Sequence, residues 1–331
     1  MLLAGDIGGT KTGLAIIDPV RGLFDPVATA ALPSNSFDSL ETLVQAFIAE
    51  NPFTVEYASF GVAGPVVAGK AAITNLPWVI EADSLRRALR VKEVRLLNDL
   101  ESIGFGIPAL RPEDIVTLNA GSPVEHGAIA VIAPGTGLGE GYVTFDGQYY
   151  RAHPSEGGHV DFAPANDLQI DLLRFLQRRL NHVSYEWVCS GMGIPYVYRF
   201  LRDGMGYDEP DWLAEKLASV QDKTPVISRA AFEMDEPPPI CVKTMELFIE
   251  ILGAEAGNLA LKVLATGGVY LAGGIPPRIL EPIRHGGFME AFLKKGRFSQ
   301  LLSHFPVRVV MNPQTALIGA ATQGLQALGR L

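Results

Sequence analysis

Short hydrophobic runs recur along the first third of the chain, and each run ends close to glycine, proline, asparagine or aspartate. Short apolar runs between turn-forming residues predict β-strands. The strands predicted in this way cover residues 2–4, 12–17, 26–32, 57–62 and 94–97. The first strand leads into the glycine-rich stretch at residues 5–10, and the last ends at Asn98 and Asp99.

Longer stretches repeat their apolar residues every three or four positions, which is the spacing of an amphipathic helix. The clearest lies at residues 36–50, where Val44 and Phe47 belong to the apolar positions. Ser36 or Asp38 is the expected N-cap of this helix, because short polar side chains accept hydrogen bonds from the first turn. The other predicted helices cover residues 82–89, 166–180, 241–264 and 315–328.

A second series of strands begins after Pro112. It covers residues 127–133, 142–145, 148–151, 269–272 and 307–311. Both series contain a strand, then a turn rich in glycine and threonine, then an antiparallel return strand. This is a weak internal repeat of structure rather than of sequence, and the mixture of strands and helices predicts an α/β protein.

Composition narrows the class of protein. The 331 residues suggest two domains, and 48% hydrophobic with 19% charged residues excludes a disordered chain. The net charge of −9 argues against nucleic acid or an anionic membrane as a partner. Two cysteines, Cys189 and Cys241, make neither a disulfide framework nor a cysteine-rich zinc site. We therefore expect a cytoplasmic, globular protein with no signal peptide and no membrane-spanning helix.

Two glycine turns are candidates for binding phosphate. In the first, at residues 5–10, adjacent glycines let backbone N–H groups approach an anion, and Asp6 is suited to a hydrated Mg²⁺ ion. In the second, residues 135–137 offer the same small residues and a hydroxyl group. Each turn taken alone is also explained as an ordinary hairpin. A third turn, at residues 271–277, could form the wall of an adenine pocket or simply start a helix with proline.

Three groups of polar residues are candidates for binding substrate. Asp99 follows a buried strand, where a carboxylate could accept a proton from a hydroxyl group, although aspartate there could also cap a helix. Glu156 and His159 lie on a tight turn that suits the recognition of hydroxyl groups, with a metal site or a plain polar turn as alternatives. Glu186 is expected to begin a helix, where a glutamate of a capping box is the alternative.

The order of these motifs along the chain resembles the bacterial glucokinase family of the hexokinase/actin/Hsp70 superfamily. The matching segments are GDIGGTK, ND, APGTGLG, SEGGH, a later glutamate and LAGGIPP. The resemblance implies an α/β protein with a two-domain RNase H-like (actin/hexokinase-like ATPase) fold, mixed sheets and an interdomain cleft. Under it we expect a small domain at residues 1–110 plus 313–331 and a large domain at residues 111–312.

The same resemblance implies ATP-dependent phosphorylation of glucose at the 6-hydroxyl, with Asp99 as the general base and Mg²⁺ near Asp6. It also implies a homodimer. The implied glucose-binding residues are Asn98, Asp99, Glu156, His159 and Glu186. The implied ATP-binding residues are Gly5, Asp6, Ile7, Gly8, Gly9 and Thr10 in the first turn, Gly135, Thr136 and Gly137 in the second, and Gly273 and Gly274 beside adenosine.

One position departs from the pattern. Lys11 stands where relatives of this group often carry asparagine, and lysine is typical of the related ROK family of sugar kinases and repressors. The zinc-binding cysteines of the ROK family are absent from the sequence, which favours the non-zinc glucokinase group. The alternatives are a kinase of another hexose or N-acetylhexosamine, a sugar sensor without catalysis, and an ATPase like Hsp70 or actin.

Overall fold

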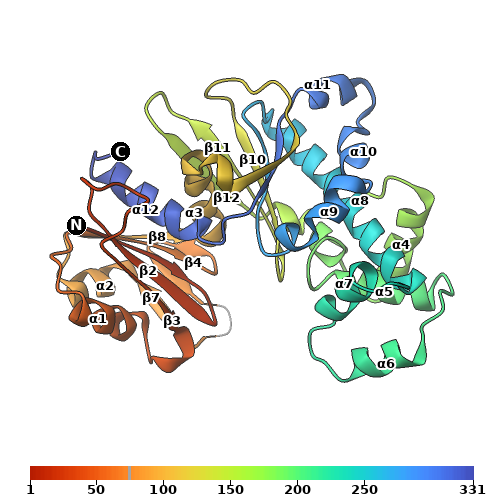
Figure 1. The fold of residues 1–331 in the computed structure, drawn as a ribbon, viewed down its shortest axis with the longest axis horizontal. Coiled ribbons are helices and arrows are strands. Elements are labelled where there is room, and N and C mark those ends of the chain that lie inside the picture. The colour runs from red at the N-terminus through yellow and green to blue at the C-terminus, as the bar shows by residue number, and fades with distance from the viewer. Residues whose placement is uncertain (74–75) are drawn as a thin grey trace. The chain divides into compact units, whose positions relative to one another are not determined.

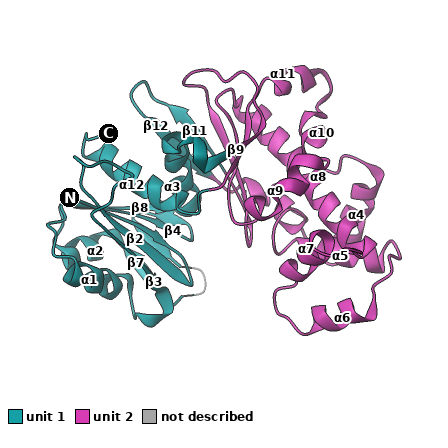
Figure 2. Cartoon of the chain, viewed as in Figure 1, with its two compact units in different colours: residues 1–115, 141–154, 312–331 teal, residues 116–140, 155–311 magenta. Residues whose placement is uncertain are grey.

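The computed structural model describes residues 1–73 and 76–331, and the chain divides into two compact units (Figure 2). The first unit contains residues 1–115, 141–154 and 312–331, and the second contains residues 116–140 and 155–311. The chain therefore enters the first unit three times. Compactness alone defines these units, so the domain boundaries expected from the sequence remain a prediction.

A mixed five-stranded sheet forms the centre of the first unit (Figure 1). Its order is β3-β2-β1-β4-β8, with β1 antiparallel to β2 and parallel to β4, which is itself parallel to β8. The strands are β1 (Leu2–Ile7), β2 (Lys11–Ile17), β3 (Ala28–Pro33), β4 (Tyr57–Val62) and β8 (Glu93–Asn98). Because β1, β4 and β8 are parallel, their carboxyl ends meet at one edge, where Ile7, Val62 and Asn98 are in register. Ligands of α/β sheets bind at such an edge.

Alternation along the strands gives this sheet two apolar faces. One face, with Leu3 and Ile16, packs in a core that includes Leu43 of α1 and Leu85 of α2. The other face packs against α12 and consists of Leu2, Ala4, Ala15, Ile17 and Tyr57. The helices and the small second sheet of this unit are α1 (Leu40–Glu50), α2 (Ala82–Leu89), α3 (Asp99–Gly106), α12 (Thr315–Ala327), β5 (Val66–Val67), β6 (Lys70–Ala72) and β7 (Val79–Glu81).

The N-cap of α1 differs from the prediction. The helix begins at Leu40 and is capped by Ser39, whose hydroxyl accepts a hydrogen bond from the Thr42 backbone N–H. Residues Ser34–Ser36 form a separate 3₁₀ turn. Several short polar residues precede the helix, and the extended backbone of Ser39 decides which of them caps it.

A six-stranded sheet has the order β12-β11-β10-β13-β14-β9. Its strands are β9 (Ile115–Asn119), β10 (Ile129–Pro134), β11 (Leu138–Phe145), β12 (Tyr150–Ser155), β13 (Gly268–Leu271) and β14 (Val307–Val310). Strands β10, β13 and β14 are parallel neighbours. The strand expected at residues 148–151 begins only at Tyr150, because Asp146 accepts hydrogen bonds from the backbone of Gln148 and Tyr149 and prolongs the turn.

The main core of the second unit is built around the long helix α8, most of whose residues are buried. The helices are α4 (Asp167–Gln177), α5 (Ile194–Asp203), α6 (Asp211–Ala218), α7 (Thr224–Phe232), α8 (Pro239–Val263), α9 (Leu280–His285), α10 (Phe288–Leu293) and α11 (Ser299–Ser303). The segment between Tyr207 and Ile240, whose role the sequence did not indicate, thus contributes two helices to this core.

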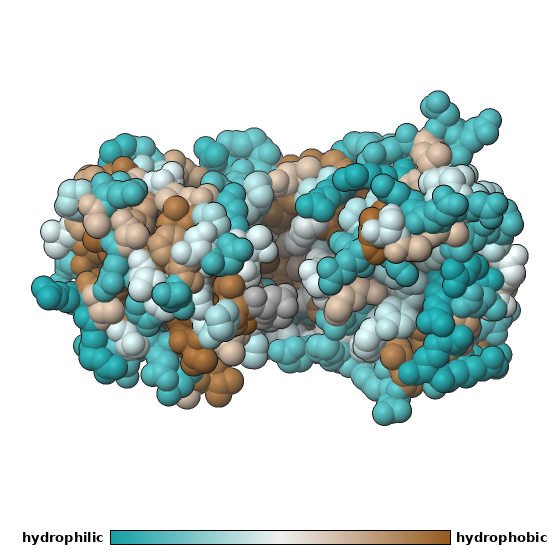
Figure 3. Space-filling view, turned by 90° about the horizontal axis from the view of Figure 1, so that it is seen from below, coloured by the Kyte–Doolittle hydropathy of each residue, from teal (hydrophilic) through white to brown (hydrophobic). Residues whose placement is uncertain are grey.

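Both cysteines are buried and free. In the part of the chain that the structure describes, no helix combines the length and the hydrophobicity needed to cross a bilayer. The face seen in Figure 3 carries mostly hydrophilic residues, with hydrophobic residues in small groups between them.

Candidate active site

The first glycine turn connects β1 to β2 and is held by Ser34, the residue that follows β3. The Ser34 hydroxyl donates to the carbonyl of Gly8 (2.8 Å), and its backbone N–H donates to the carbonyl of Thr10 (3.0 Å). The Ser34 hydroxyl also lies 3.0 Å from the hydroxyl of Thr12. The strand that begins with the predicted residues 2–4 continues through Ile7. Asp6 therefore sits on a strand, and only residues 8–10 form the turn.

Asp6 lies close enough to Asp99 for their charges to interact. Burial and the charge of Asp99 raise the pKa of Asp6 from 3.8 to about 6. Two carboxylates that repel each other at a largely buried position form a suitable donor set for a hard divalent cation, which would remove the repulsion. The residues present therefore fit the Mg²⁺ ion that the family pattern implies.

Asn98, and not Asp99, caps helix α3. The Asn98 side-chain oxygen accepts from the Leu100 N–H (2.9 Å), and the Glu101 carboxylate accepts from the Asn98 N–H (3.3 Å), which together form a capping box. The Asn98 Nδ2 donates to the carbonyl of Gly64 (3.1 Å). These bonds leave the amide one further N–H for a ligand. Asp99 is the first helical residue, which corrects its alternative interpretation as the cap.

The second glycine turn is held in the second unit by backbone hydrogen bonds. Gly135 donates to the carbonyl of Gly137 (2.9 Å), which closes the turn. Its own carbonyl accepts from the Gly191 N–H (2.8 Å), and the carbonyl of Thr136 accepts from Met192 (3.0 Å). The turn that joins β10 to β11 is thus fixed against the segment that precedes α5.

The third turn lies beside the second, at the carboxyl ends of the parallel strands β10 and β13. The Ile275 N–H donates to the carbonyl of Pro134 (3.3 Å). Gly273 has a φ of +81°, and a Cβ there would lie 2.7 Å from the same carbonyl, so only glycine fits. The structure therefore brings together the two turns that the sequence assigned to phosphate and adenosine.

The three predicted sugar-binding residues of the second unit form one cluster. His159 Nε2 lies 4.0 Å from a carboxylate oxygen of Glu156 and 3.9 Å from one of Glu186. The Glu156 side chain is 82% exposed and that of His159 is 59% exposed, whereas that of Glu186 is only 18% exposed. An exposed cluster of carboxylates and an imidazole can still accept and donate hydrogen bonds to a polyhydroxyl ligand.

Glu186 does not begin an α-helix, so that prediction is wrong. It lies in the 3₁₀ turn Tyr185–Trp187, and its Oε2 accepts a hydrogen bond from the Leu138 N–H at the start of β11 (3.0 Å). The second glycine turn ends at Gly137, immediately before this N–H. Glu186 therefore links the proposed sugar cluster to the proposed phosphate turn.

The structure thus assembles the predicted residues in two sets. Asp6, Asn98 and Asp99 belong to the first unit with the first glycine turn, and the sugar cluster belongs to the second unit with the other two turns. The alternative of a metal site at residues 155–161 receives no support, because no three histidine, cysteine, aspartate or glutamate side chains among the described residues are arranged so that they could hold a metal ion.

Sequence reasoning missed a buried pair of acidic residues, Glu140 and Glu255. Both are almost completely inaccessible to solvent. Burial, then the charge of Glu255, raise the pKa of Glu140 to about 8, and the Lys262 charge lowers it in part. Glu140 is the one acidic residue of β11, and Glu255 stands among small and apolar residues of α8, but the sequence does not show that the two residues meet.

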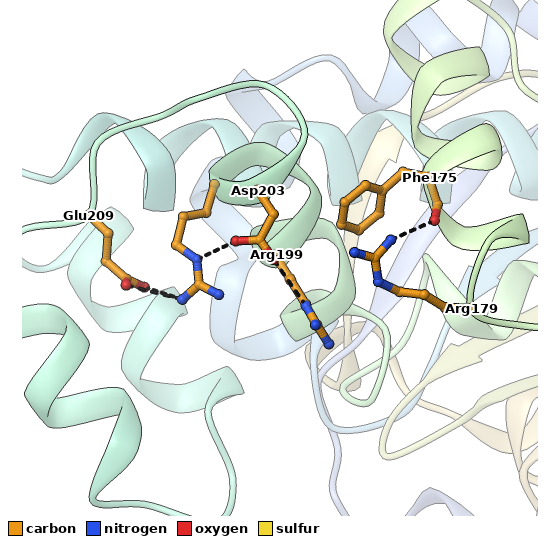
Figure 4. A network of polar contacts seen from close by, with 6 residues as sticks. Phe175, Arg179, Arg199, Asp203 and Glu209 are labelled. Carbon is orange, nitrogen blue, oxygen red and sulfur yellow. Dashed lines mark hydrogen bonds and ion pairs between the residues drawn. The ribbon is translucent and has the colours of Figure 1, made fainter.

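A second polar region, between α5, α6 and α7, contains a cavity of about 380 Å³. Its arginines already have carboxylate partners: Asp203 accepts from Arg199 (3.2 Å) and Arg202 (2.8 Å), and Glu209 binds Arg202 through both oxygens. Figure 4 shows Asp203 beside Arg199, with Glu209 across the network. These ion pairs join α5 to the loop before α6.

Three features define a phosphotransferase of the actin/hexokinase-like class. They are the mixed sheets, the glycine turns at strand ends, and the pair Asp6 and Asp99 near the first glycine turn. A sequence model described as Glucokinase matches residues 3–327. The glucokinase of Nostoc punctiforme is 40% identical over 97% of this chain and 98% of its own length. The chain belongs to the glucokinase family.

Solved structures support the fold. A glucokinase from an Antarctic psychrotroph is 31% identical, with a TM-score of 0.83 over 98% of both chains. A ROK family glucokinase from Streptomyces griseus, in complex with glucose and AMPPNP, is 21% identical, with a TM-score of 0.63 over 98% of this chain and 99% of that one. This more distant protein shares the fold.

Proposed function

We propose that this chain transfers the γ-phosphoryl group of ATP to the 6-hydroxyl of glucose, giving glucose 6-phosphate and ADP. The observation that carries the proposal is the pair Asp6 and Asp99, which places a base and a cation-binding carboxylate beside the first glycine turn. Membership of the glucokinase family supports the same reaction. The related fold that was crystallised with glucose and AMPPNP accommodates a hexose together with an ATP analogue.

In this proposal, glucose is recognised through hydrogen bonds to its hydroxyl groups. Asn98 and Asp99 contribute from the first unit, and Glu156, His159 and Glu186 contribute from the second. A site that is built to bind hydroxyl groups rejects an analogue that lacks one, because its polar groups then stay unpaired. The sugar cluster therefore supports a sugar kinase over an ATPase that needs no sugar.

Asp99 acts as the general base. It accepts the proton of the 6-hydroxyl while this oxygen attacks the γ-phosphorus in line, and the bond to the β-phosphate oxygen breaks to release ADP. The phosphate chain of ATP lies against the first glycine turn, at residues 8–10, and the second, at residues 135–137, with adenosine beside residues 273–274. General-base catalysis of this kind contributes about 10²–10⁴-fold to the rate.

Asp6 would hold Mg²⁺, directly or through water. When bound, the ion supplies positive charge that neutralises the phosphate oxygens of the donor. It would also offset the repulsion between Asp6 and Asp99, and so lower the pKa of Asp6. Magnesium sites with few protein ligands are common where the substrate phosphates complete the coordination.

The proposal is tested by the release of ADP from Mg-ATP with glucose, mannose, fructose, N-acetylglucosamine and no sugar. We expect glucose to stimulate turnover most strongly and to yield glucose 6-phosphate by mass spectrometry. Equal turnover with and without sugar would indicate an ATPase instead. Stimulation by another sugar alone would change the acceptor, and sugar binding without turnover with ATP, ADP or polyphosphate would indicate a sensor.

We further infer that the enzyme acts as a homodimer in the cytoplasm. The free thiols of Cys189 and Cys241 fit a reducing compartment. Light scattering at several protein concentrations measures the oligomeric state, and a mass of one chain at all of them would contradict the dimer.

A further inference from the structure

The carboxyl group of Glu140 lies directly beneath the turn that carries Glu156 and His159. Glu140 belongs to β11 and is 1% exposed. A Cβ built on Gly157 would collide with its Oε2 and lie 3.0 Å from its Cδ. A Cβ on Gly158 would collide with the carbonyl oxygen of Leu138. The turn therefore rests on the strand without room for a side chain between them.

A second contact fixes the turn to the same residue. The Ser155 hydroxyl donates to the carbonyl of Glu140 (3.0 Å) and accepts from the N–H of Gly157 (3.2 Å). The backbone and the side chain of Glu140 thus both support the residues that precede His159. Among the described residues, however, the buried Oε1 of Glu140 has no hydrogen-bond partner.

The groups that face Glu140 do not neutralise a negative charge there. Glu255 of α8 is fully buried, and its carboxylate is bound by Lys262 (3.2 Å) and Asn258 (2.7 Å). Lys262 is therefore already paired. The buried thiol of Cys189 also lies near enough for the charge of Glu140 to act on it, and burial first, then Glu255 and Glu140, raise the pKa of this thiol.

Two further groups touch the Glu255 network from other elements. Lys295 donates to the carbonyl of Ala254 (2.8 Å) and to the side chain of Asn258 (2.5 Å). Burial lowers the pKa of Lys295 and raises that of Tyr185, whose hydroxyl accepts from Asn258 (3.0 Å). These contacts surround Glu255 rather than Glu140, so an ionised Glu140 would face the charge of Glu255 inside the protein.

We propose that Glu140 is a positioning residue for sugar recognition: its neutral carboxyl group seats the turn at residues 155–159, and loss of its proton displaces that turn and weakens glucose binding. The proton passes to hydroxide in the solvent, and the displaced turn lets water reach the new charge. The inference rests on the proposed function, because it assumes that Glu156 and His159 bind the sugar.

The test compares the wild type with Glu140→Gln, which keeps the shape of the neutral acid and cannot ionise. The KM for glucose and the kcat are measured from neutral to alkaline pH, with the KM for ATP as an internal reference. In the wild type, the glucose KM should rise about tenfold for each pH unit above the midpoint. In Glu140→Gln the rise in glucose KM at alkaline pH should disappear. The other titrating groups, Lys295 included, are present in both proteins, so the difference between the two reports on Glu140.

The same alkaline rise in Glu140→Gln would overturn the inference. If this variant does not fold, as judged by near-UV circular dichroism, Gly157→Ala replaces it, since its methyl group presses on the same carboxyl group. A glucose KM that Gly157→Ala leaves unchanged at neutral pH would likewise overturn the inference. Calorimetry of glucose binding without ATP distinguishes failure of the proposed function from failure of the inference about Glu140. A wild type that binds glucose but does not phosphorylate it contradicts the proposed function alone.

Discussion

At the scale of single residues, two carboxyl groups have pKa values that burial and a nearby carboxylate raise. One lies beside a predicted phosphate-binding turn, and the other lies in the interior of the second unit. Asp6 is shifted to about 6 by burial and Asp99, beside a turn suited to phosphate. Glu140 is shifted to about 8 by burial and Glu255, in the interior of the second unit. A cation can relieve the first repulsion when substrate binds. The second has no such relief, so Glu140 stays protonated through most of the neutral range.

Asp99→Asn tests the proposed base. Asparagine keeps the size and the first-turn position of the side chain but accepts no proton, so kcat should fall by about 10²–10⁴-fold. Glucose binding, measured by calorimetry, should persist in part. The matched control is Asp83→Asn, an exposed aspartate in the first turn of α2. A near-normal kcat in Asp99→Asn, with the mass verified, would exclude Asp99 as the base.

Glu140→Gln also changes the pH dependence of stability. The pKa of Glu140 is raised in the folded protein, so its contribution is fully present below pH 4.5 and is lost as the pH rises through 8. Between pH 4.5 and 8, the unfolding free energy of the wild type should therefore fall by up to about 1.4 kcal/mol per pH unit relative to that of the variant. Urea unfolding at several pH values measures the difference. Glu50→Gln, at an exposed position in α1, is the control variant, and parallel curves for the wild type and Glu140→Gln would contradict the shift.

At the scale of elements, the hydrophobic spacing predicted most strands and long helices. The side chains that a strand or helix buries recur at a fixed spacing, so a short stretch of sequence is enough to reveal the pattern. Helix α2 has the predicted bounds, and β4 does too. What the sequence left open is the choice among equivalent groups and the contacts between distant ones. Ser39 caps α1 although neighbouring serine and aspartate residues have the same chemistry.

The candidate site follows the same division. Glycine turns were predictable because close backbone approach requires glycine, as at Gly273. The cluster of Glu156 and His159 was predictable because both residues share one turn. The bond from Leu138 to Glu186 and the meeting of Glu140 with Glu255 were not, since each joins elements far apart in the chain.

Gly319→Ala tests the packing of α12 on α3. A Cβ at Gly319 would collide with the carbonyl oxygen of Ser102 and lie 2.7 Å from the backbone nitrogen of Gly106, and backbone cannot turn aside as a side chain can. The variant should lose about 1–3 kcal/mol of unfolding free energy or more. Thermal and urea unfolding measure the loss. Gly13→Ala is the control, because no described atom lies within 4 Å of its Cβ; equal stabilities would refute the close contact.

At the scale of the whole molecule, the first unit is assembled from three separate stretches of chain. The last stretch, residues 312–331, supplies α12, which covers Leu2, Ala4, Ala15 and Ile17 of the central sheet. The two units therefore differ in how they depend on the chain end: the second unit is complete at Met311, whereas the first is not.

A chain that ends at Met311 should therefore lose the order of its first unit only. Without α12, one apolar face of β1 and β2 is open to water, so the amide groups of β1 should exchange with deuterium orders of magnitude faster. The amide groups of β10 and α8 should keep their protection. Hydrogen exchange read by mass spectrometry distinguishes the two units. Full protection of β1 in the shortened chain would show that α12 is dispensable.

Because the first unit is assembled from distant stretches of chain, its central sheet is synthesised before the helix that covers it. The ribosome makes β1 well before α12, and at about 5–20 residues per second the stretch between residues 115 and 312 takes roughly 10–40 s to translate. During that time α1 and α2 can already cover one face of the nascent sheet. The waiting face contains Ala4 and Ala15 beside Leu2 and Ile17. The two alanines limit the apolar area that this face, with Tyr57, presents to other chains in a crowded cell before α12 covers it.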